Sequence, residues 1–128
     1  PFIDNMAQAM DTADLVIARA GATTVAELAC IGRAAVFIPF PYAADDHQAA
    51  NAQSLVSVGA ALMQREEAMN TESMVEILEP LLADRGLLDR MGASALSRGR
   101  PEAAHAIVTD LADLGGMSQA LSNRAEAA

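Results

Sequence analysis

The sequence lacks tryptophan and lysine, and it has few aromatic residues or thiols. Its 128 residues include one tyrosine, three phenylalanines and one cysteine, and all eight basic residues are arginine. Because 52% of the residues are hydrophobic, a single globular domain can still bury a core, built from Ala, Val, Leu, Ile and Met. The one cysteine, Cys30, cannot form an internal disulfide, and its position in a helical pattern predicts a small buried side chain.

Positive charge is scarce, and the formal net charge is −9 at pH 7. Binding to a phosphate backbone needs clustered cations, so we expect no nucleic-acid partner. The same deficit argues against this segment as the contact with an anionic membrane. No apolar run approaches the roughly 20 residues that span a bilayer. The first residues also lack the charged-then-apolar order of a signal peptide, so we expect a cytoplasmic protein.

Strand-like and helix-like segments alternate along the chain. Short apolar runs predict buried strands at residues 15–18, 35–38 and 60–63. Helical spacing predicts helices over residues 4–12, 23–31, 45–58, 71–83, 86–97 and 101–114. Gly32 and Gly59 suit helix ends, and Pro101 suits a first helical turn. The polar residues 115–128 predict a flexible tail.

This order of elements predicts an α/β fold with a parallel sheet and flanking helices. Open doubly wound sheets commonly have about five or six strands. The three expected here therefore indicate the C-terminal half of a Rossmann-like domain. In such sheets ligands bind beyond the carboxyl ends of the strands, where loops lead into helices. Two loops of this sequence lie at such positions.

The first loop is Arg19-Ala20-Gly21-Ala22-Thr23-Thr24-Val25-Ala26-Glu27. Gly21 allows a tight turn and a close approach to a ligand. The free N–H groups and the dipole of the following helix suit a diphosphate, and a carboxylate at Glu27 suits a ribose diol. The alternative is a capping box, in which Thr24 and Glu27, placed in the first turn, satisfy the helix's own amides.

The second loop, residues 39–52, gathers Asp45, Asp46, His47, Gln48 and Asn51 at a predicted helix start. Paired donors and acceptors of this kind suit the recognition of sugar hydroxyls. The alternative is that Asp45 or Asp46 caps the helix while the other side chains are solvated. We expect no metal site, because the acidic residues and His47 are adjacent and no second His or Cys is nearby. No residue has the setting of a catalytic base or nucleophile.

Together these loops resemble the donor-binding half of the two-domain, GT-B-like glycosyltransferases of the MurG type. The resemblance covers roughly residues 1–114. It rests on five segments, which are Phe2-Ile3-Asp4-Asn5-Met6, Ala13-Asp14-Leu15-Val16-Ile17, Arg19 through Glu27, Ala35-Val36-Phe37-Ile38-Pro39-Phe40-Pro41 and His47-Gln48-Ala49-Ala50-Asn51-Ala52. Residues 1–114 would accordingly be part of a nucleotide-sugar-binding domain. One departure is His47, which stands where the family also has a carboxamide.

The resemblance implies an inverting hexosyltransferase that moves N-acetylglucosamine from UDP-N-acetylglucosamine to lipid I, giving lipid II for peptidoglycan. The resemblance also implies that this transferase requires neither a cofactor nor a metal, and that UDP-N-acetylglucosamine is its donor substrate. The uracil would meet the backbone of Ile3, and Gln48, helped by His47, would read the sugar. Arg19 would brace the loop. The diphosphate and ribose would lie on Gly21, Ala22, Thr23, Thr24, Val25, Ala26 and Glu27.

The same resemblance places the acceptor domain, a glycine-rich loop and the presumed base outside this chain. We therefore expect no catalytic residue here and no transfer by this chain alone. The lipid-linked acceptor and the inner membrane's cytoplasmic face would meet the missing N-terminal domain, as in a peripheral membrane enzyme. Two alternatives stay open, a UDP-sugar transferase with another acceptor, and a non-catalytic nucleotide-sugar-binding or docking module.

Overall fold

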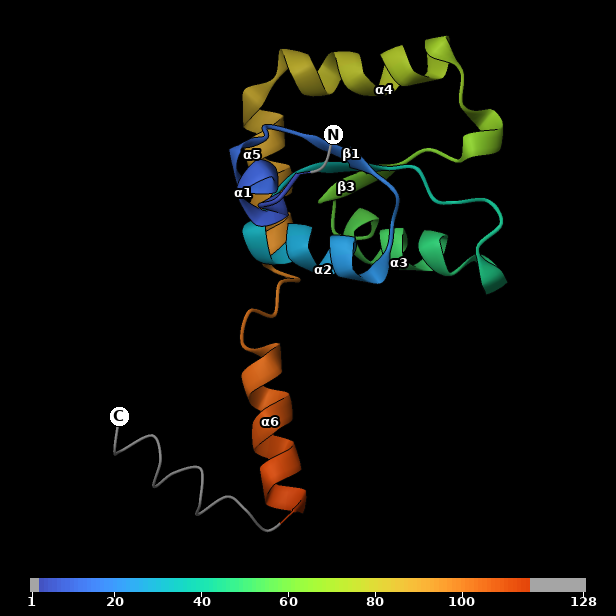
Figure 1. Cartoon of the computed structure of the whole chain (residues 1–128). Helices are drawn as coiled ribbons and strands as arrows, with labels where there is room; N and C mark the ends of the chain where they lie inside the picture. The colour runs from blue at the N-terminus through green and yellow to red at the C-terminus, as the bar shows by residue number, and fades with distance from the viewer. Residues whose placement is uncertain (1–2, 116–128) are drawn as a thin grey trace.

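The computed structural model describes residues 3–115, and these residues form a small α/β fold (Figure 1). Three strands alternate with helices in the predicted order. The strands are β1 (Val16–Ala18), β2 (Ala35–Phe37) and β3 (Ala61–Met63). The α-helices are α1 (Met6–Thr12), α2 (Ala22–Ile31), α3 (His47–Val56), α4 (Thr71–Ala83), α5 (Arg85–Leu96) and α6 (Ala103–Leu114). Short 3₁₀ turns, η1 (Ala44–Asp46) and η2 (Glu66–Ala68), precede α3 and α4.

The three strands form one parallel sheet in the order β1-β2-β3, which confirms the predicted fold class. Ile17, Val36 and Leu62 are aligned across it and therefore share one face. β2 is buried on both faces, as a central parallel strand should be. The carboxyl ends of all three strands lie at the same edge, and this edge receives the loops that lead into α2, α3 and α4.

Helices cover both faces of the sheet (Figure 1). Helices α2 and α3 lie against the face that carries Ala35 and Phe37, and α4 lies over the face that carries Val36. Helix α5 contributes residues to both clusters and packs against α2 near Gly32, where the strands begin. The edge at the carboxyl ends of the strands is therefore left to the loops.

The structure corrects several predicted boundaries. Helix α3 begins at His47, because Asp45 and Asp46 have left-handed backbone angles with φ of 48° and 55°. Pro101 lies in a turn before α6 and not in its first helical turn. Gly32 does end α2 in a left-handed conformation, with φ of 75°, as its sequence position predicts. The tail predicted beyond Gly115 lies outside the described residues.

Cys30 is exposed, so the prediction of a buried thiol is wrong. Helix α2 buries Val25, Leu28 and Ala29, and this is the face that meets the sheet. Each further residue turns a helix by about 100°. Cys30 therefore faces away from the core although it follows two buried residues.

Helix α6 extends away from the sheet and the other helices (Figure 1). Its apolar side chains Ile107, Val108, Leu111 and Leu114 are all more than half exposed. Among the described residues, none of the helices has the length and apolar character needed to cross a membrane.

Candidate nucleotide-sugar site

The start of helix α2 presents unused backbone donors at the carboxyl edge of the sheet. Gly21 is the N-cap residue, and no side chain caps this helix. The first helical hydrogen bond, from the Val25 amide to the Gly21 carbonyl, is 3.0 Å long. The amides of Ala22, Thr23 and Thr24 precede that bond. A helix start of this kind can bind an anion through its N–H groups and its dipole.

The capping-box alternative for Thr24 and Glu27 is wrong. Because α2 begins at Ala22, Thr24 is its third residue and Glu27 its sixth. A capping box needs the threonine at the N-cap position itself. The sequence had suggested that Glu27 shares the first turn of the helix with Thr24. Glu27 is instead exposed in the second turn. Its carboxylate therefore stands one turn beyond the free amides.

The packing of this protein does not require a glycine at position 21. Gly21 has φ of −62° and ψ of 146°, which any residue can adopt, so the turn at this position does not depend on glycine. A Cβ atom there would meet only the Thr24 hydroxyl, at 3.9 Å, which is ordinary contact. The missing side chain instead leaves the helix start open to a ligand.

Helix α3 begins with the polar residues His47 and Gln48 at the same edge. Its N-cap residue Asp46 makes no side-chain bond to the helix, so the capping alternative for Asp46 is wrong. The Gln48 carboxamide oxygen accepts a hydrogen bond from the Phe40 amide at 2.9 Å. The His47 side chain is 68% exposed, with Nε2 3.9 Å from Asp45 Oδ2. His47 is therefore open to a ligand, while Gln48 is held by the loop.

Asn51 joins the two helix starts, and the sequence did not assign it a separate role. Its Nδ2 donates to the Ala20 carbonyl at 3.1 Å, directly before the start of α2. Asn51 lies one turn after His47 on α3, so it points to the side of that helix near the binding loops. The sequence signal that could have identified Asn51 was a second carboxamide following Gln48 on the same predicted helix.

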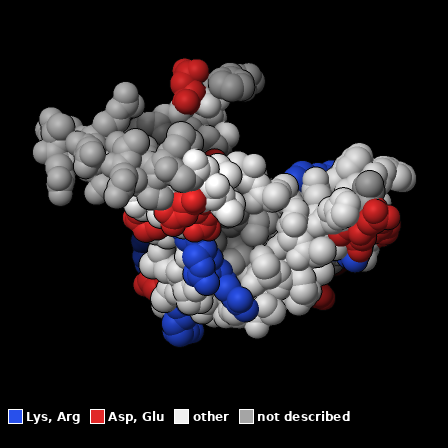
Figure 2. All heavy atoms as spheres, turned by 90° about the horizontal axis from the view of Figure 1, so that it is seen from below, with Lys and Arg blue, Asp and Glu red and all other residues white. Residues whose placement is uncertain are grey.

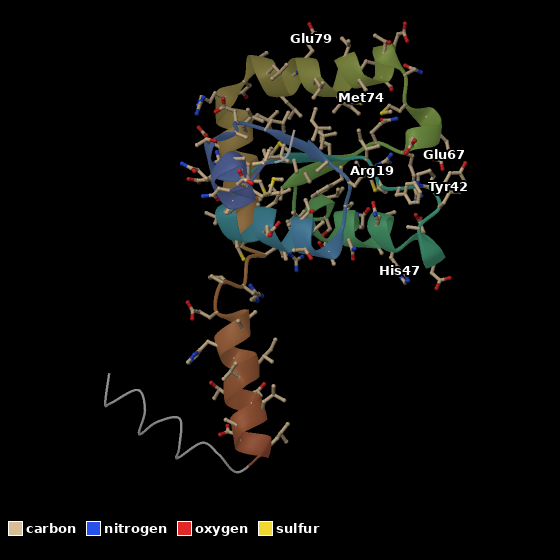
Figure 3. The ribbon with its side chains drawn as sticks, in the orientation of Figure 1. Arg19, Tyr42, His47, Glu67, Met74 and Glu79 are labelled. Atoms are coloured by element: carbon tan, nitrogen blue, oxygen red, sulfur yellow. The ribbon has the colours of Figure 1, made fainter. Side chains whose placement is uncertain are left out.

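Arg19 braces the loop after β2, as expected. Its Nη1 donates to the carbonyls of Ile38 and Pro39 at 3.2 and 3.1 Å and also pairs with Glu66. The guanidinium lies 5.6 Å from the centre of the Phe40 ring, within the range of a cation–π contact. Arg19, Tyr42 and Glu67 gather at one end of the molecule, with His47 at the start of α3 below them (Figure 3).

A second ion pair lies beside the start of α3. Arg65 donates from Nη1 and Nη2 to the two carboxylate oxygens of Asp46, at 2.9 and 2.6 Å. These hydrogen bonds hold the pKa of the Asp46 carboxyl below its ordinary value, and they raise the pKa of Arg65. The sequence did not predict this pairing, because the two residues are 19 positions apart on different loops.

The residue predicted to meet the uracil, Ile3, lies outside the two binding loops in the sequence. Ile3 is 52% exposed and precedes helix α1. A hollow of about 450 Å³ runs along the open edge of β1 and reaches Thr24.

On the face seen from below, charged side chains lie in small separate groups on a largely uncharged surface (Figure 2). Within residues 3–115, no group of three potential metal ligands occurs.

Comparison with known families supports a shared origin over most of the chain. A model described as the glycosyltransferase family 28 C-terminal domain matches residues 1–107. The chain is 49% identical over 113 residues to a protein of Nitratidesulfovibrio vulgaris strain DP4, covering 88% of this chain and 31% of the relative. It is also 49% identical over 114 residues to a Magnetococcus marinus protein, covering 89% and 31%.

Both relatives are named UDP-N-acetylglucosamine–N-acetylmuramyl-(pentapeptide) pyrophosphoryl-undecaprenol N-acetylglucosamine transferase. A crystal structure of Acinetobacter baumannii MurG is similar in fold, with a TM-score of 0.82 and 45% identity. The similarity covers 87% of this chain and 31% of that structure. The chain thus spans about a third of the length of the relatives that it matches.

Proposed function

Because this chain belongs to the family of glycosyltransferase family 28 C-terminal domains, we propose that it supplies the UDP-N-acetylglucosamine site of a longer transferase. The relatives' names specify transfer of N-acetylglucosamine to N-acetylmuramyl-(pentapeptide) pyrophosphoryl-undecaprenol. The proposed product is lipid II, a precursor of peptidoglycan. This chain spans about a third of those proteins, so its own part is donor binding and not the complete reaction.

One observation carries the proposal, namely the uncapped start of α2 lying beside the polar start of α3. The bond from Asn51 to the Ala20 carbonyl holds these two helix starts together. Amides at Ala22, Thr23 and Thr24 would bind the diphosphate. Glu27, one turn further along α2, would accept hydrogen bonds from the ribose. His47 and Gln48 would then read the sugar, and the Ile3 backbone would meet the uracil.

This arrangement suits a displacement in which UDP departs. The acceptor hydroxyl would attack the anomeric carbon, invert it, and break its bond to the diphosphate. Negative charge then grows on the diphosphate, where the α2 amides and helix dipole would stabilise it without a metal ion. The residues that take the proton from the acceptor hydroxyl would come from the rest of the longer protein.

The acceptor and the membrane would meet the longer protein through its other parts. The acceptor carries an undecaprenol chain, which resides in a membrane. A chain with a net charge of −9 is repelled by an anionic lipid surface. We place the complete enzyme at the cytoplasmic face of the inner membrane as a peripheral protein, with its basic surface outside this segment.

Saturation-transfer NMR of the chain with UDP-N-acetylglucosamine tests the donor site. We expect transfer to the uridine and ribose protons, and a marked weakening at the ribose with Glu27→Ala. Glu79→Ala is the matched control, because Glu79 is an exposed glutamate on α4 whose side chain points away from the sheet (Figure 3). Absence of transfer to a folded sample, or equal loss in both variants, would count against the proposed site.

A further inference from the structure

The loop after β3 carries two adjacent residues of opposite charge that hold two different loops. Arg65 forms the two-bond fork with Asp46, in the loop after β2. Glu66 pairs with Arg19, at the end of β1. One dipeptide therefore connects the loops that lead into α2 and α3. Arg65 and Glu66 both reach these loops through their side chains and not through main-chain hydrogen bonds.

The backbone next to this fork is in an unusual conformation. Asp45 and Asp46 both have left-handed angles, with φ of 48° and 55° and ψ of 29°. Residues with a side chain seldom adopt this conformation, although Asp and Asn tolerate it better than most. His47 follows immediately as the first residue of α3. The direction of the His47 and Gln48 side chains therefore depends on how this turn is held.

The fork has the geometry needed to hold the turn. Two parallel N–H···O bonds fix the planes of the guanidinium and the carboxylate relative to each other. Asp45 has the same backbone conformation, yet its side chain is 91% exposed and lies 3.9 Å from Nε2 of His47. Of the two aspartates, Asp46 alone has a two-bond partner within the described residues.

We propose that Arg65 is a positioning residue, which by clamping Asp46 sets the sugar-reading start of helix α3. The inference rests on the proposed function, because it concerns the sugar of the UDP-sugar donor. Gln48 is also held by a second contact, the hydrogen bond from the Phe40 amide. Phe40 lies under Arg19, which Glu66 holds. The dipeptide thus reaches the pair His47 and Gln48 by two routes, through Asp46 and through Arg19 with Phe40.

This role differs from a general contribution to stability. The Arg65 and Asp46 side chains are 47% and 50% exposed, and ion pairs of such exposure add little to folding. Loss of the fork should therefore lower the unfolding midpoint only slightly and leave the affinity for UDP unchanged. The part of the affinity that comes from the sugar should fall, because His47 and Gln48 would no longer be held.

The first test measures the dissociation constants of UDP and UDP-N-acetylglucosamine by NMR titration. The dissociation constant of UDP divided by that of UDP-N-acetylglucosamine reports the contribution of the sugar to binding. We expect Arg65→Gln and Asp46→Asn each to lower that ratio by about two- to fivefold, the range of an exposed ion pair. The double variant should lower it no further, since both changes remove one interaction. Arg65→Lys should restore part of it, because lysine keeps the charge without the fork.

Arg90→Gln is the matched control for these variants. Arg90 also forms an exposed pair with an aspartate, Asp84, at 3.2 Å, but it lies in α5, away from the loops. An unchanged ratio in Arg65→Gln would overturn the proposal. So would an equal weakening of UDP and UDP-N-acetylglucosamine, or a ratio that falls as far in Arg90→Gln.

A second test needs no ligand and separates this inference from the proposed function. The amide proton shift of Phe40 reports its hydrogen bond to Gln48. We expect that shift to move in Arg65→Gln and in Asp46→Asn, and to stay in place in Arg90→Gln. If the unmodified chain binds no nucleotide sugar, the proposed function fails, while the Phe40 shift still decides whether Arg65 positions α3. An unmoved shift would overturn the positioning role.

Discussion

The carboxamide of Asn51 donates a hydrogen bond to the carbonyl of Ala20, with a distance of 3.1 Å from Nδ2 to the oxygen. Ala20 is fully buried, so this carbonyl has little access to water. The bond connects the residue next to Gly21, at the start of α2, with the first turns of α3. It therefore sets the distance between the amides proposed for the diphosphate and the side chains proposed for the sugar.

Asn51→Ala should lower the free energy of unfolding by about 1–2 kcal/mol, because it leaves a buried carbonyl without its partner. It should also weaken binding of UDP-N-acetylglucosamine, since the two helix starts lose their connection. Urea denaturation and NMR titration measure the two effects. Gln53→Ala on the exposed side of the same helix is the control and should change neither quantity.

Gly92→Ala should destabilise the protein by about 1–3 kcal/mol, as overpacking does. A Cβ atom at Gly92 would lie 2.4 Å from the Gly32 carbonyl oxygen, so α5 would have to move away from α2. Gly86→Ala in the same helix is the control. Its Cβ would meet only side-chain ends of Asp84 and Arg90, at 3.1 and 3.3 Å. Thermal denaturation that finds equal losses in both would contradict this packing.

Gly21→Ala should affect the ligand more than the fold. Alanine accepts the backbone angles at this position, so the free energy of unfolding should change by about 1 kcal/mol at most, as for an N-cap change. The new methyl group stands at the start of α2, where the diphosphate approaches. We expect the dissociation constant for UDP-N-acetylglucosamine to rise about tenfold, which equals a loss of ~1.4 kcal/mol in binding free energy. Unchanged affinity would place the diphosphate elsewhere.

The main elements could be predicted because their signals are local. The apolar runs at Val16–Ala18, Ala35–Phe37 and Ala61–Met63 have the pattern of buried strands, and all three are strands. Helix α4 has the predicted bounds, since Asn70 and Ser73 form a capping box at its start. The capping box suggested by the same spacing at Thr24 and Glu27 was wrong, because helix α2 begins before Thr24.

The contribution of Asp46 to stability should depend on pH. Its pKa is lowered in the folded protein, chiefly by the hydrogen bonds from Arg65. The stabilisation is therefore complete above the pKa of an unfolded aspartate, about 4, and is lost as the pH falls through the lower folded value. The melting temperatures of the unmodified chain and Asp46→Asn should differ at neutral pH and converge in acid. A difference that grows in acid would contradict this sign.

The open edge of β1 should promote self-association of the chain. Among the described residues β1 pairs only with β2, and Ile17 is 47% exposed beside the unpaired edge. Exposed edge strands readily pair with other chains. Light scattering should show a mass that rises with concentration, and Ile17→Lys should reduce that rise. One monomeric species over a wide concentration range would contradict the expectation.

Contacts between distant side chains could not be read from the sequence. Arg65 meets Asp46, and Glu66 meets Arg19, only because three parallel strands bring their loops to one edge. Exposure of Cys30 depends in the same way on which face of α2 the sheet occupies. The residues proposed for the site could be identified from the sequence, whereas the side chains that hold them could not.

The most direct test of the donor site is a titration of the ¹⁵N-labelled chain with UDP-N-acetylglucosamine, followed through its backbone amides. We predict the largest shifts at Ala22, Thr23 and Thr24, with smaller shifts at His47 and Gln48. UDP should move the first three amides and leave the last two in place. Saturating shifts confined to other residues, or no shifts in a folded sample, would contradict the assignment of the α2 start as the diphosphate site.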